Sequence, residues 1–383
     1  MKYLGFLLAL TIFLSGCAAA PAETGPSTVT EAPAAISTTI PTQPPATIPP
    51  DPVEVLLDSM TVEEKVGQLF LARCPDADAV TELQTYHLGG YILFGRDFQG
   101  QTPDSVRDTL AAYQSAASIP LLIAVDEEGG TVCRVSSQTA FRKAPFASPR
   151  SLYDTGGIEL VLDTEAEKAA LLESLGVNVN MAPVCDVATQ WGAFMYRRSL
   201  GQSPEITGHF AAGAAARMAD FQIGSVLKHF PGYGNNTDTH TGIATDHRSL
   251  EELEASDLIP FAMGIEGGCD AILVSHTIVT AFDSTLPATL SPAVHDYLRQ
   301  EMGFGGVIVT DDLVMGAITE TYGAGEAAVL SVLAGNDLLC STEYQVQYQA
   351  VLEAVREGRI STELLNEAVT RILKWKQELG LIE

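Results

Sequence analysis

The stretch Gly303–Leu313, GFGGVIVTDDL, combines the two features on which the fold prediction rests. Its run Gly306–Val309 is short and almost continuously apolar, as expected of a strand that is covered on both faces. Two carboxylates, Asp311 and Asp312, follow that run after a single threonine. A buried strand that ends in acidic side chains is typical of parallel sheets whose chemistry lies at the carboxyl ends of their strands.

The same arrangement recurs along the chain in both directions from this stretch. Seven further runs are short and mostly apolar, and several are followed directly by polar side chains, among them Asp126, Lys228, His229 and His276. Such side chains would gather on one face of a closed parallel sheet. These runs are Gly67–Ala72, Gly90–Phe94, Leu121–Val125, Val177–Ala182, Gly224–Leu227, Ala271–Val274 and Asp337–Leu339.

Helical patterns lie between most of the apolar runs. Several open with proline after a residue that can cap a helix, as in Ser203-Pro204. Eight strand–helix units predict an α/β fold, a single-domain (β/α)8 barrel similar to the TIM barrel, with an open doubly wound sheet as the alternative. The expected helices are Pro103–Ala117, Glu165–Leu175, Pro204–Phe221, Leu250–Gly264, Pro292–Met302, Gln345–Glu357 and Thr362–Glu378.

The first residues have the pattern of a targeting signal. Lys2 precedes the apolar stretch Leu4–Leu14, which is too short to span a bilayer, and the sequence then runs into LSGC ending at Cys17. This resembles a bacterial lipobox and implies cleavage before Cys17 and lipidation of its thiol. An ordinary signal peptide is the alternative. We expect an extracytoplasmic protein, bound to the bacterial cell membrane only through that lipid anchor.

Three regions follow from this organisation. Residues 1–17 are the expected lipoprotein signal, with Cys17 as the lipidation site. Residues 18–52 are rich in Pro, Thr, Ala and Ser, a composition typical of a disordered, flexible tether. Residues 53–383 are the expected barrel domain.

Composition narrows the classes of partner. The 383 residues include 21 basic and 48 acidic side chains, a formal charge of −27. Such a chain repels phosphate backbones, so a nucleic-acid partner is not expected. Five cysteines remain besides Cys17, an odd number that cannot all pair internally, and no spacing indicates zinc. We expect most of them to be small buried apolar side chains.

Two segments after predicted strands carry candidate binding residues. The first is DEEGGTVCR at Asp126–Arg134, where two glycines allow a tight turn that brings Asp126 and Arg134 together. A carboxylate accepts hydrogen bonds from sugar hydroxyls and an arginine donates a planar pair, although solvated loop charges are the alternative. The second is Lys228-His229, because two such side chains are not both expected to point into a core.

The loop after Lys228-His229 holds a candidate acid/base. Asp238 and His240 stand two residues apart, so both side chains can face one way, and the carboxylate can then orient the imidazole. An exposed loop histidine is the alternative reading. A metal site formed with Asp246 and His247 is a further one, but the spacing matches no ligand signature. Of the two carboxylates after the Gly306–Val309 strand, the first, Asp311, is the preferred nucleophile.

Taken together, these segments resemble the bacterial glycoside hydrolase family 3 β-N-acetylglucosaminidases. The resemblance covers residues 53–383, and its motifs keep their order and spacing. They are DEEGGTVCR (126–134), NVNMAPVCDV (178–187), RRSLG (197–201), KHFPGYG (228–234), DTH (238–240), LPATLSP (286–292) and GFGGVIVTDDLVMGAI (303–318).

The resemblance implies a role for each matching position. Asp311 matches the family's nucleophile, His240 its histidine acid/base, and Asp238 the carboxylate that partners this histidine. Tyr233 stands where many relatives carry histidine. The residues that match those holding the terminal sugar are Asp126, Arg134, Arg198, Lys228 and His229.

The implied activity is retaining hydrolysis of terminal β-linked N-acetylglucosamine from muropeptides or chitin-type oligosaccharides, through a covalent glycosyl-enzyme. No metal and no organic cofactor are expected, and the oligomeric state is left open. Three alternatives remain: a phosphorylase of the same linkage, a β-glucosidase, and a sugar-binding lipoprotein without turnover.

Overall fold

The computed structural model describes residues 51–234 and 244–383, together with Gly25. All of its helices and strands belong to one compact unit that begins at Pro50. Within the described ranges, no helix is both long and apolar enough to cross a membrane.

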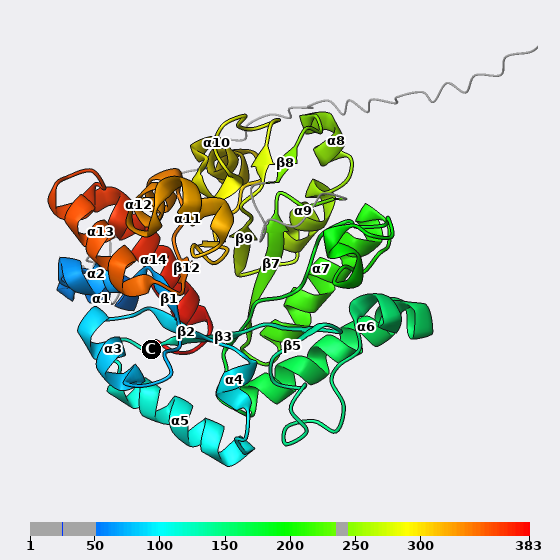
Figure 1. Cartoon of the computed structure of the whole chain (residues 1–383), viewed down its shortest axis with the longest axis horizontal. Coiled ribbons are helices and arrows are strands. Elements are labelled where there is room, and N and C mark those ends of the chain that lie inside the picture. Colours follow the sequence, from blue (N-terminus) through cyan, green and yellow to red (C-terminus); the bar gives the residue numbers. More distant parts are fainter. Residues whose placement is uncertain (1–24, 26–50, 235–243) are drawn as a thin grey trace, which may run out of the picture. The chain divides into compact units, whose positions relative to one another are not determined.

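Eight parallel strands form a closed barrel (Figure 1). Their order is β11-β9-β7-β6-β3-β2-β1-β12. A parallel bridge between Val309 and Leu338 joins β11 to β12 and closes the sheet. The strands are β1 (Phe70–Arg73), β2 (Gly90–Leu93), β3 (Leu122–Val125), β6 (Val179–Asn180), β7 (Gly224–Phe230), β9 (Ala271–Val274), β11 (Val307–Thr310) and β12 (Leu339–Ser341).

Helices surround the strands (Figure 1). Several begin where the sequence places a capping side chain before proline: Thr102 accepts a hydrogen bond from Ser105 N at 3.2 Å, and Ser203 accepts one from Ile206 N at 3.4 Å. The α-helices are α1 (Pro52–Ser59), α2 (Val62–Gln68), α3 (Ala79–Tyr86), α4 (Gly95–Phe98), α5 (Pro103–Ala116), α6 (Pro149–Glu173), α7 (Pro204–Ala219), α8 (Leu250–Glu254), α9 (Leu258–Glu266), α10 (Pro292–Asp296), α11 (Gly316–Tyr322), α12 (Ala324–Ala334), α13 (Tyr344–Arg356) and α14 (Thr362–Glu378).

Short elements decorate the loops that leave the barrel. Strands β4 (Glu127–Gly129) and β5 (Val132–Cys133) pair antiparallel directly after β3. Strands β8 (Thr245–Asp246) and β10 (Ile278–Val279) pair in parallel after β7 and β9. These additions lie at the carboxyl ends of barrel strands, the face on which barrel enzymes carry their active sites.

The predicted barrel is confirmed, but some boundaries were wrong. The helix expected at Glu165–Leu175 begins already at Pro149, capped by Ser148. The sequence pattern missed the first part of this helix because of the pair Gly156-Gly157. Gly157 has φ 69° and ψ −163° and interrupts the helical backbone. The expected strand Gly67–Ala72 begins only at Phe70, since α2 continues to Gln68.

Other differences come from polar side chains and breaks in the backbone. The expected strand Val177–Ala182 is shortened to β6, because the Asn178 side chain forms hydrogen bonds with backbone groups beside it. It accepts from Ile123 N at 2.7 Å and donates to Leu121 O at 3.0 Å. The expected helix Leu250–Gly264 is split into α8 and α9. Helices α1, α2, α3, α4, α11 and α12 were not predicted.

Candidate active site

A cavity of about 550 Å³ opens at the carboxyl ends of the strands. Charged groups line one part of it and apolar side chains the rest. A cavity of this size and composition is typical of small-molecule sites. The lining residues include Phe94, Asp126, Glu128, Arg134, Phe194, Arg198, Lys228, His229, Tyr233, Asp311, Asp312 and Met315.

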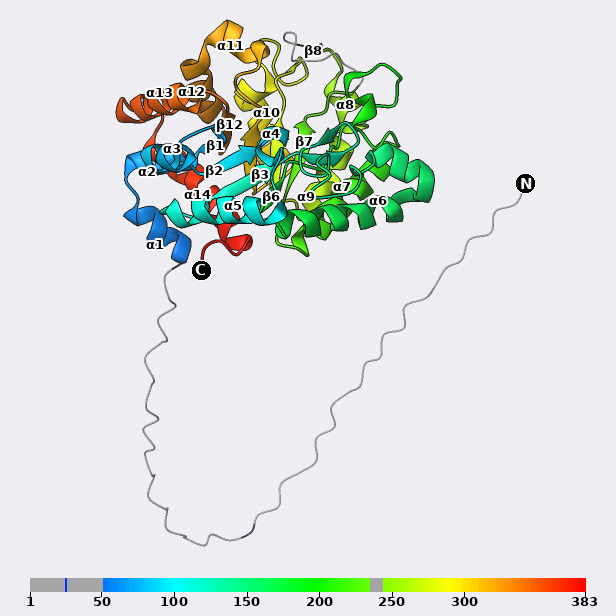
Figure 2. The same ribbon diagram turned by 60° about the horizontal axis from the view of Figure 1, so that its bottom comes forward.

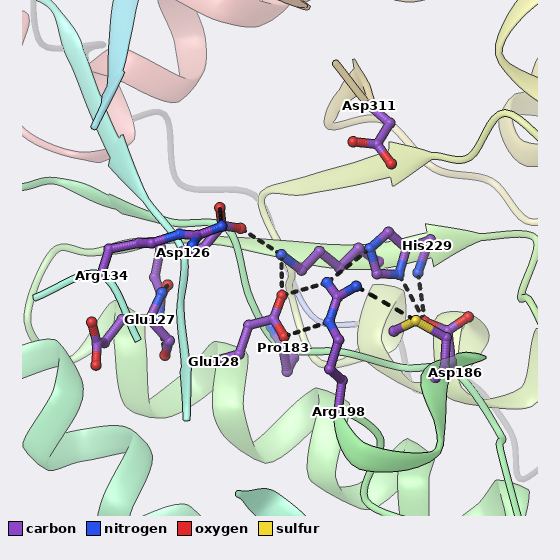
Figure 3. A network of polar contacts seen from close by, with 12 residues as sticks. Asp126, Glu127, Glu128, Arg134, Pro183, Asp186, Arg198, His229 and Asp311 are labelled. Carbon is purple, nitrogen blue, oxygen red and sulfur yellow. Dashed lines mark hydrogen bonds and ion pairs between the residues drawn. The ribbon is translucent and has the colours of Figure 1, made fainter. Parts of the chain in front are cut away.

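The charged part of the lining is built around the Lys228 ammonium. Figure 3 shows its partners Asp126 and Glu128, with Arg198 beside them. Lys228 Nζ lies 2.7 Å from Asp126 Oδ1 and 2.7 Å from Glu128 Oε1. Arg198 donates to the same Glu128 from Nε at 2.9 Å and from Nη2 at 2.6 Å. These four side chains, hereafter the clamp, come from the segment after β3, from the segment between β6 and α7, and from strand β7. Each cation is held by carboxylates, so its position is fixed before any ligand arrives.

Glu128 is the buried centre of the clamp. The residue is 2% exposed. Burial by itself would raise the pKa of Glu128, but Lys228 and Arg198 outweigh that effect and hold the pKa well below its usual range. The carboxylate is therefore charged at neutral pH.

His229 is oriented by a buried carboxylate on the other side of the clamp. Asp186 accepts from His229 Nδ1 at 2.8 Å and from Tyr233 N at 2.7 Å. His229 Nε2 faces Arg198 Nη2 at 3.3 Å. Nε2 of His229 therefore lies opposite an arginine, which only donates, while Nδ1 is held by the Asp186 carboxylate.

Arg134 lies beyond Asp126, on the β4–β5 hairpin. Its Nη2 is 3.7 Å from Asp126 Oδ2, and its guanidinium lies 5.3 Å from the centre of the Phe94 ring. The predicted approach of Asp126 and Arg134 is thus present, although the distance exceeds a direct hydrogen bond.

The two carboxylates after β11 have different surroundings. Asp312 accepts three hydrogen bonds, from Val314 N at 3.1 Å and from Thr342 N and Oγ1 at 3.2 and 2.6 Å. Among the described residues, Asp311 accepts only one, at 2.9 Å from the amide of Asp312. Asp312 therefore holds the loop after β11 in place, while Asp311 is left available to the cavity.

The charge state of Asp311 depends on its neighbours. Burial would raise the pKa of Asp311, but His276, then His229, shift it in the other direction, and the pKa lies below its ordinary value. His276 is itself fixed, with Nδ1 at 2.7 Å from Thr289 Oγ1 and Nε2 at 3.1 Å from the carbonyl of Asp312. A charged carboxylate is what a nucleophile at this position requires.

Sequence reasoning missed several residues that build the site. Glu128 and Asp186 lie inside the motifs on which the resemblance rests, and each is an acidic residue in a buried segment, which is the signal that could have found them. Lys168 also went unnoticed. Its buried ammonium donates to Glu128 O at 2.7 Å and pairs with Glu165 at 2.6 Å.

Some predicted residues cannot be placed. Asp238, His240 and Cys17 lie outside the described residues. Asp246, a ligand in the alternative prediction of a metal site, has its carboxylate 2.6 Å from the Arg248 guanidinium. Within residues 51–234 and 244–383, no group of three or more His, Cys, Asp or Glu side chains could hold a metal ion. The five cysteines described are free thiols, and all but Cys133 are buried.

The geometry agrees with a comparison of the chain with known protein families. Residues 61–375 match the model of the glycosyl hydrolase family 3 N-terminal domain. The chain belongs to glycoside hydrolase family 3. It is accordingly a glycoside hydrolase, as the sequence motifs predicted.

Individual family 3 proteins are similar over most of the chain. The β-hexosaminidase LpqI of Mycobacterium tuberculosis is 29% identical over 387 residues, covering 98% of this chain and 97% of LpqI. A solved family 3 β-N-acetylglucosaminidase from Paenibacillus sp. FPU-7 is 34% identical with a TM-score of 0.79; the match covers 84% of this chain but only 63% of that one. A solved β-glucoside phosphorylase, BglX, is 25% identical with a TM-score of 0.73, over 86% of this chain and 60% of that chain.

Proposed function

We propose that this protein is a retaining exo-β-N-acetylglucosaminidase. The observation that carries the proposal is the position of Asp311, a charged carboxylate with one local hydrogen bond that lines the same cavity as the clamp. The names of the similar family 3 proteins support the sugar. A non-catalytic sugar-binding protein would not need a carboxylate so placed.

The clamp holds the terminal sugar. Asp126 accepts hydrogen bonds from sugar hydroxyls, while Lys228, Arg198 and Arg134 donate to the sugar's oxygens. Because Glu128 holds Lys228 and Arg198 in place, little side-chain entropy is lost when the sugar binds.

The reaction is a double displacement with two balanced steps. Asp311 attacks the anomeric carbon, the bond to the leaving oxygen breaks, and His240 gives its proton to that oxygen. Water then attacks the same carbon, His240 takes a proton from it, and Asp311 leaves. Asp238 orients the imidazole of His240 in both steps. Nothing in these steps requires a metal or an organic cofactor.

We place the enzyme outside the cytoplasm, with Cys17 as its lipid anchor and residues 18–52 as its tether. The lipobox-like LSGC and the Pro/Thr-rich composition support this placement. The natural substrates are then muropeptides or chitin-type fragments that occur outside the cell.

A phosphorylase of the same linkage is the second candidate, because the fold is also similar to that of a β-glucoside phosphorylase. An imidazole acid/base repels an incoming phosphate less than a carboxylate would. Incubating the enzyme and substrate with and without inorganic phosphate, followed by product analysis, separates the two: a sugar 1-phosphate identifies a phosphorylase, and free sugar in both samples identifies a hydrolase.

The nucleophile is tested with a pair of variants. On 4-nitrophenyl β-N-acetylglucosaminide, Asp311→Ala should lower kcat by roughly 10³-fold or more while the thermal transition stays near that of the wild type. Asp312→Ala should instead lower the unfolding free energy by about 2 kcal/mol, because the groups of Thr342 and Val314 lose their acceptor. An active Asp311→Ala enzyme would contradict the assignment. A wild-type enzyme that hydrolyses the matching glucoside but not the N-acetylglucosaminide would be a β-glucosidase.

The acid/base is tested through the leaving group. His240→Ala should slow hydrolysis of chitobiose, a poor leaving group, by about 10²- to 10⁴-fold. It should slow hydrolysis of the nitrophenyl glycoside much less, because nitrophenolate leaves without a proton. Equal losses on both substrates would exclude the role.

A further inference from the structure

The second part of α6 carries a buried ion pair that the proposed mechanism does not use. Lys168 Nζ lies 2.6 Å from Glu165 Oε1, and the two side chains are 0% and 1% exposed. Figure 2 shows α6, in green, beside α7 on one side of the barrel. Removing two charges from water is costly, and their mutual attraction often does no more than repay that cost. Stability alone is therefore a weak reason for such a pair.

The ammonium of this pair binds the backbone of the residue at the centre of the clamp. Lys168 Nζ donates a hydrogen bond to the backbone carbonyl of Glu128 at 2.7 Å. The side chain of the same residue binds Lys228 and Arg198. The carbonyl and the carboxylate belong to one residue, so fixing the carbonyl limits where the carboxylate can lie.

The β4–β5 hairpin restrains this residue weakly. In the pairing of the two strands, Glu127 lies opposite Cys133 and Gly129 lies opposite Val132, so the register skips Glu128. Such a bulge disrupts the hydrogen bonds of the ladder. Two glycines follow, with φ 96° and 65° at positions 129 and 130, and glycine adopts many backbone conformations. The hydrogen bond from α6 therefore supplies a restraint that the hairpin lacks.

The carboxylate of the pair has a different task. Among the described residues, Glu165 Oε2 has no hydrogen-bond partner, while Oε1 accepts from Lys168. Glu165 is thus linked to the hairpin only through the ammonium, whose buried charge it balances. The donor to the hairpin and the charge that balances it are two separate functions on one helix.

We propose that Lys168 is a positioning residue for the clamp. Its hydrogen bond to the Glu128 carbonyl sets where the Glu128 carboxylate holds Lys228 and Arg198, and so sets the affinity for the terminal sugar. Glu165 makes the buried ammonium tolerable to the fold but does not itself affect the sugar. The inference rests on the proposed function, because binding of N-acetylglucosamine by the clamp is its main readout.

Three variants separate the hydrogen bond from the charge. Lys168→Met removes the donor and leaves Glu165 unpaired. The double variant Lys168→Met/Glu165→Leu removes the donor and both charges, with apolar side chains of similar size. Glu165→Gln keeps the donor and removes only the balancing charge. Each is compared with the wild type by its midpoint of urea unfolding, by kcat and KM on 4-nitrophenyl β-N-acetylglucosaminide, and by the inhibition constant of free N-acetylglucosamine.

The expected results differ for the three variants. Lys168→Met should lower the urea midpoint and raise KM and the inhibition constant about tenfold. The double variant should regain the midpoint, because a buried pair can be replaced by apolar side chains, yet keep the raised constants. Glu165→Gln should lower the midpoint and leave both constants near those of the wild type. In all three, kcat should stay within about twofold, since Asp311 is untouched.

Glu167→Gln is the matched control on the same helix, because Glu167 is 64% exposed and lies 3.4 Å from Arg142 at the surface. It should change none of these quantities. A double variant that regains wild-type KM and inhibition constant along with its midpoint would overturn the proposal, since the pair would then be structural only. Constants raised as much by Glu165→Gln as by Lys168→Met would also overturn it.

Amide hydrogen exchange gives a readout that does not depend on the reaction. Exchange across residues 127–134 should be faster in the double variant than in the wild type, because the hairpin has lost its restraint. Unchanged exchange there would contradict the proposal. A wild type that neither hydrolyses the glycoside nor binds N-acetylglucosamine would be a failure of the proposed function, and the exchange rates would still decide whether Lys168 positions the hairpin.

Discussion

Two adjacent aspartates after β11 divide two tasks between them. The side chain of Asp312 is fully used by the amides and hydroxyl of Val314 and Thr342. Asp311 accepts a hydrogen bond from Asp312 N and is kept charged by its neighbours His276 and His229. The same side-chain chemistry thus gives a structural anchor at one position and a candidate nucleophile at the next, because the backbone turns between them.

Glu128 provides the sharpest test at the residue scale. Glu128→Gln keeps the shape but removes the charge between Lys228 and Arg198, so it should lower kcat/KM by roughly 10²-fold and the unfolding free energy by about 3 kcal/mol. Since the folded pKa is depressed, the charge stabilises the protein above the ordinary pKa of glutamate, and that stability is lost as the pH falls toward the folded pKa. The gap between wild type and variant should therefore narrow below about pH 4.5.

Urea unfolding at pH 7 and at pH 4 measures this gap. Glu326→Gln serves as the control, because Glu326 pairs with Arg359 at 2.6 Å on the surface, where both side chains are exposed. The control should leave activity and the unfolding transition unchanged. A Glu128→Gln enzyme that behaves like this control would mean that the clamp does not depend on its buried charge.

Helix α6 shows how one backbone position shapes an element. It runs from Pro149 to Glu173, but Gly157 takes φ 69° and ψ −163°, so two helical pieces meet at an angle. The first piece carries Arg150, which ties down the segment bearing Tyr196. The second carries Lys168, which donates a hydrogen bond to the backbone carbonyl of Glu128. One element thus reaches the site at two places because glycine permits the break.

Gly157→Ala tests the break. No atom lies within 4 Å of the added methyl group, so the cost is the backbone conformation alone, about 2 kcal/mol. Gly305→Ala is the matched control, since that position also has open space but lacks a positive φ; it should be neutral or slightly stabilising. Chemical denaturation of both variants measures the change in unfolding free energy, which should be negative for Gly157→Ala and zero or slightly positive for Gly305→Ala. Equal effects would show that the angle between the pieces of α6 is not set at Gly157.

The barrel as a whole buries a lysine at the end opposite the active site. Lys376, on α14, is fully buried and donates to Gln68 Oε1 at 2.6 Å. Burial lowers the pKa of Lys376 to about 7. Because the unfolded state binds the proton more tightly than the folded state, the cost of burying the charge is largest below pH 7 and disappears as the pH rises toward the unfolded pKa.

Lys376→Met should therefore stabilise the protein at pH 6, by about 3 kcal/mol after allowing for the unpaired Gln68 side chain. Between pH 7 and pH 9 the wild type should gain stability relative to this variant, at about 1.4 kcal/mol per pH unit. Lys143→Met, at an exposed position, is the control and should show no such dependence. If the unfolding free energies of the wild type and of Lys376→Met depend on pH in the same way, the prediction that Lys376 carries a buried charge is wrong.

The sequence by itself determined the barrel, its family and the location of most of the clamp. Strands covered on both faces must be short and apolar, and chemistry at their carboxyl ends leaves polar residues directly after them, so both signals are local. Asp126, Lys228, His229 and Asp311 could be named for this reason. The double glycine in Asp126–Arg134 also pointed to Arg134, and the motif match added Arg198. Asp238 and His240 remain predictions.

Only the tertiary structure decided which groups hold the clamp and which carboxylate is free. Glu128 reaches the centre of the clamp, and Asp186 and Lys168 reach its neighbours, through contacts between segments far apart in the chain, and no local pattern encodes a distance of that kind. The break in α6 was missed for the same reason, since a Gly-Gly pair signals an interruption but not that the helix resumes. Asp311 was preferred from the sequence only because it comes first after the strand, whereas the hydrogen bonds from Val314 and Thr342 to Asp312 show which of the two side chains is engaged.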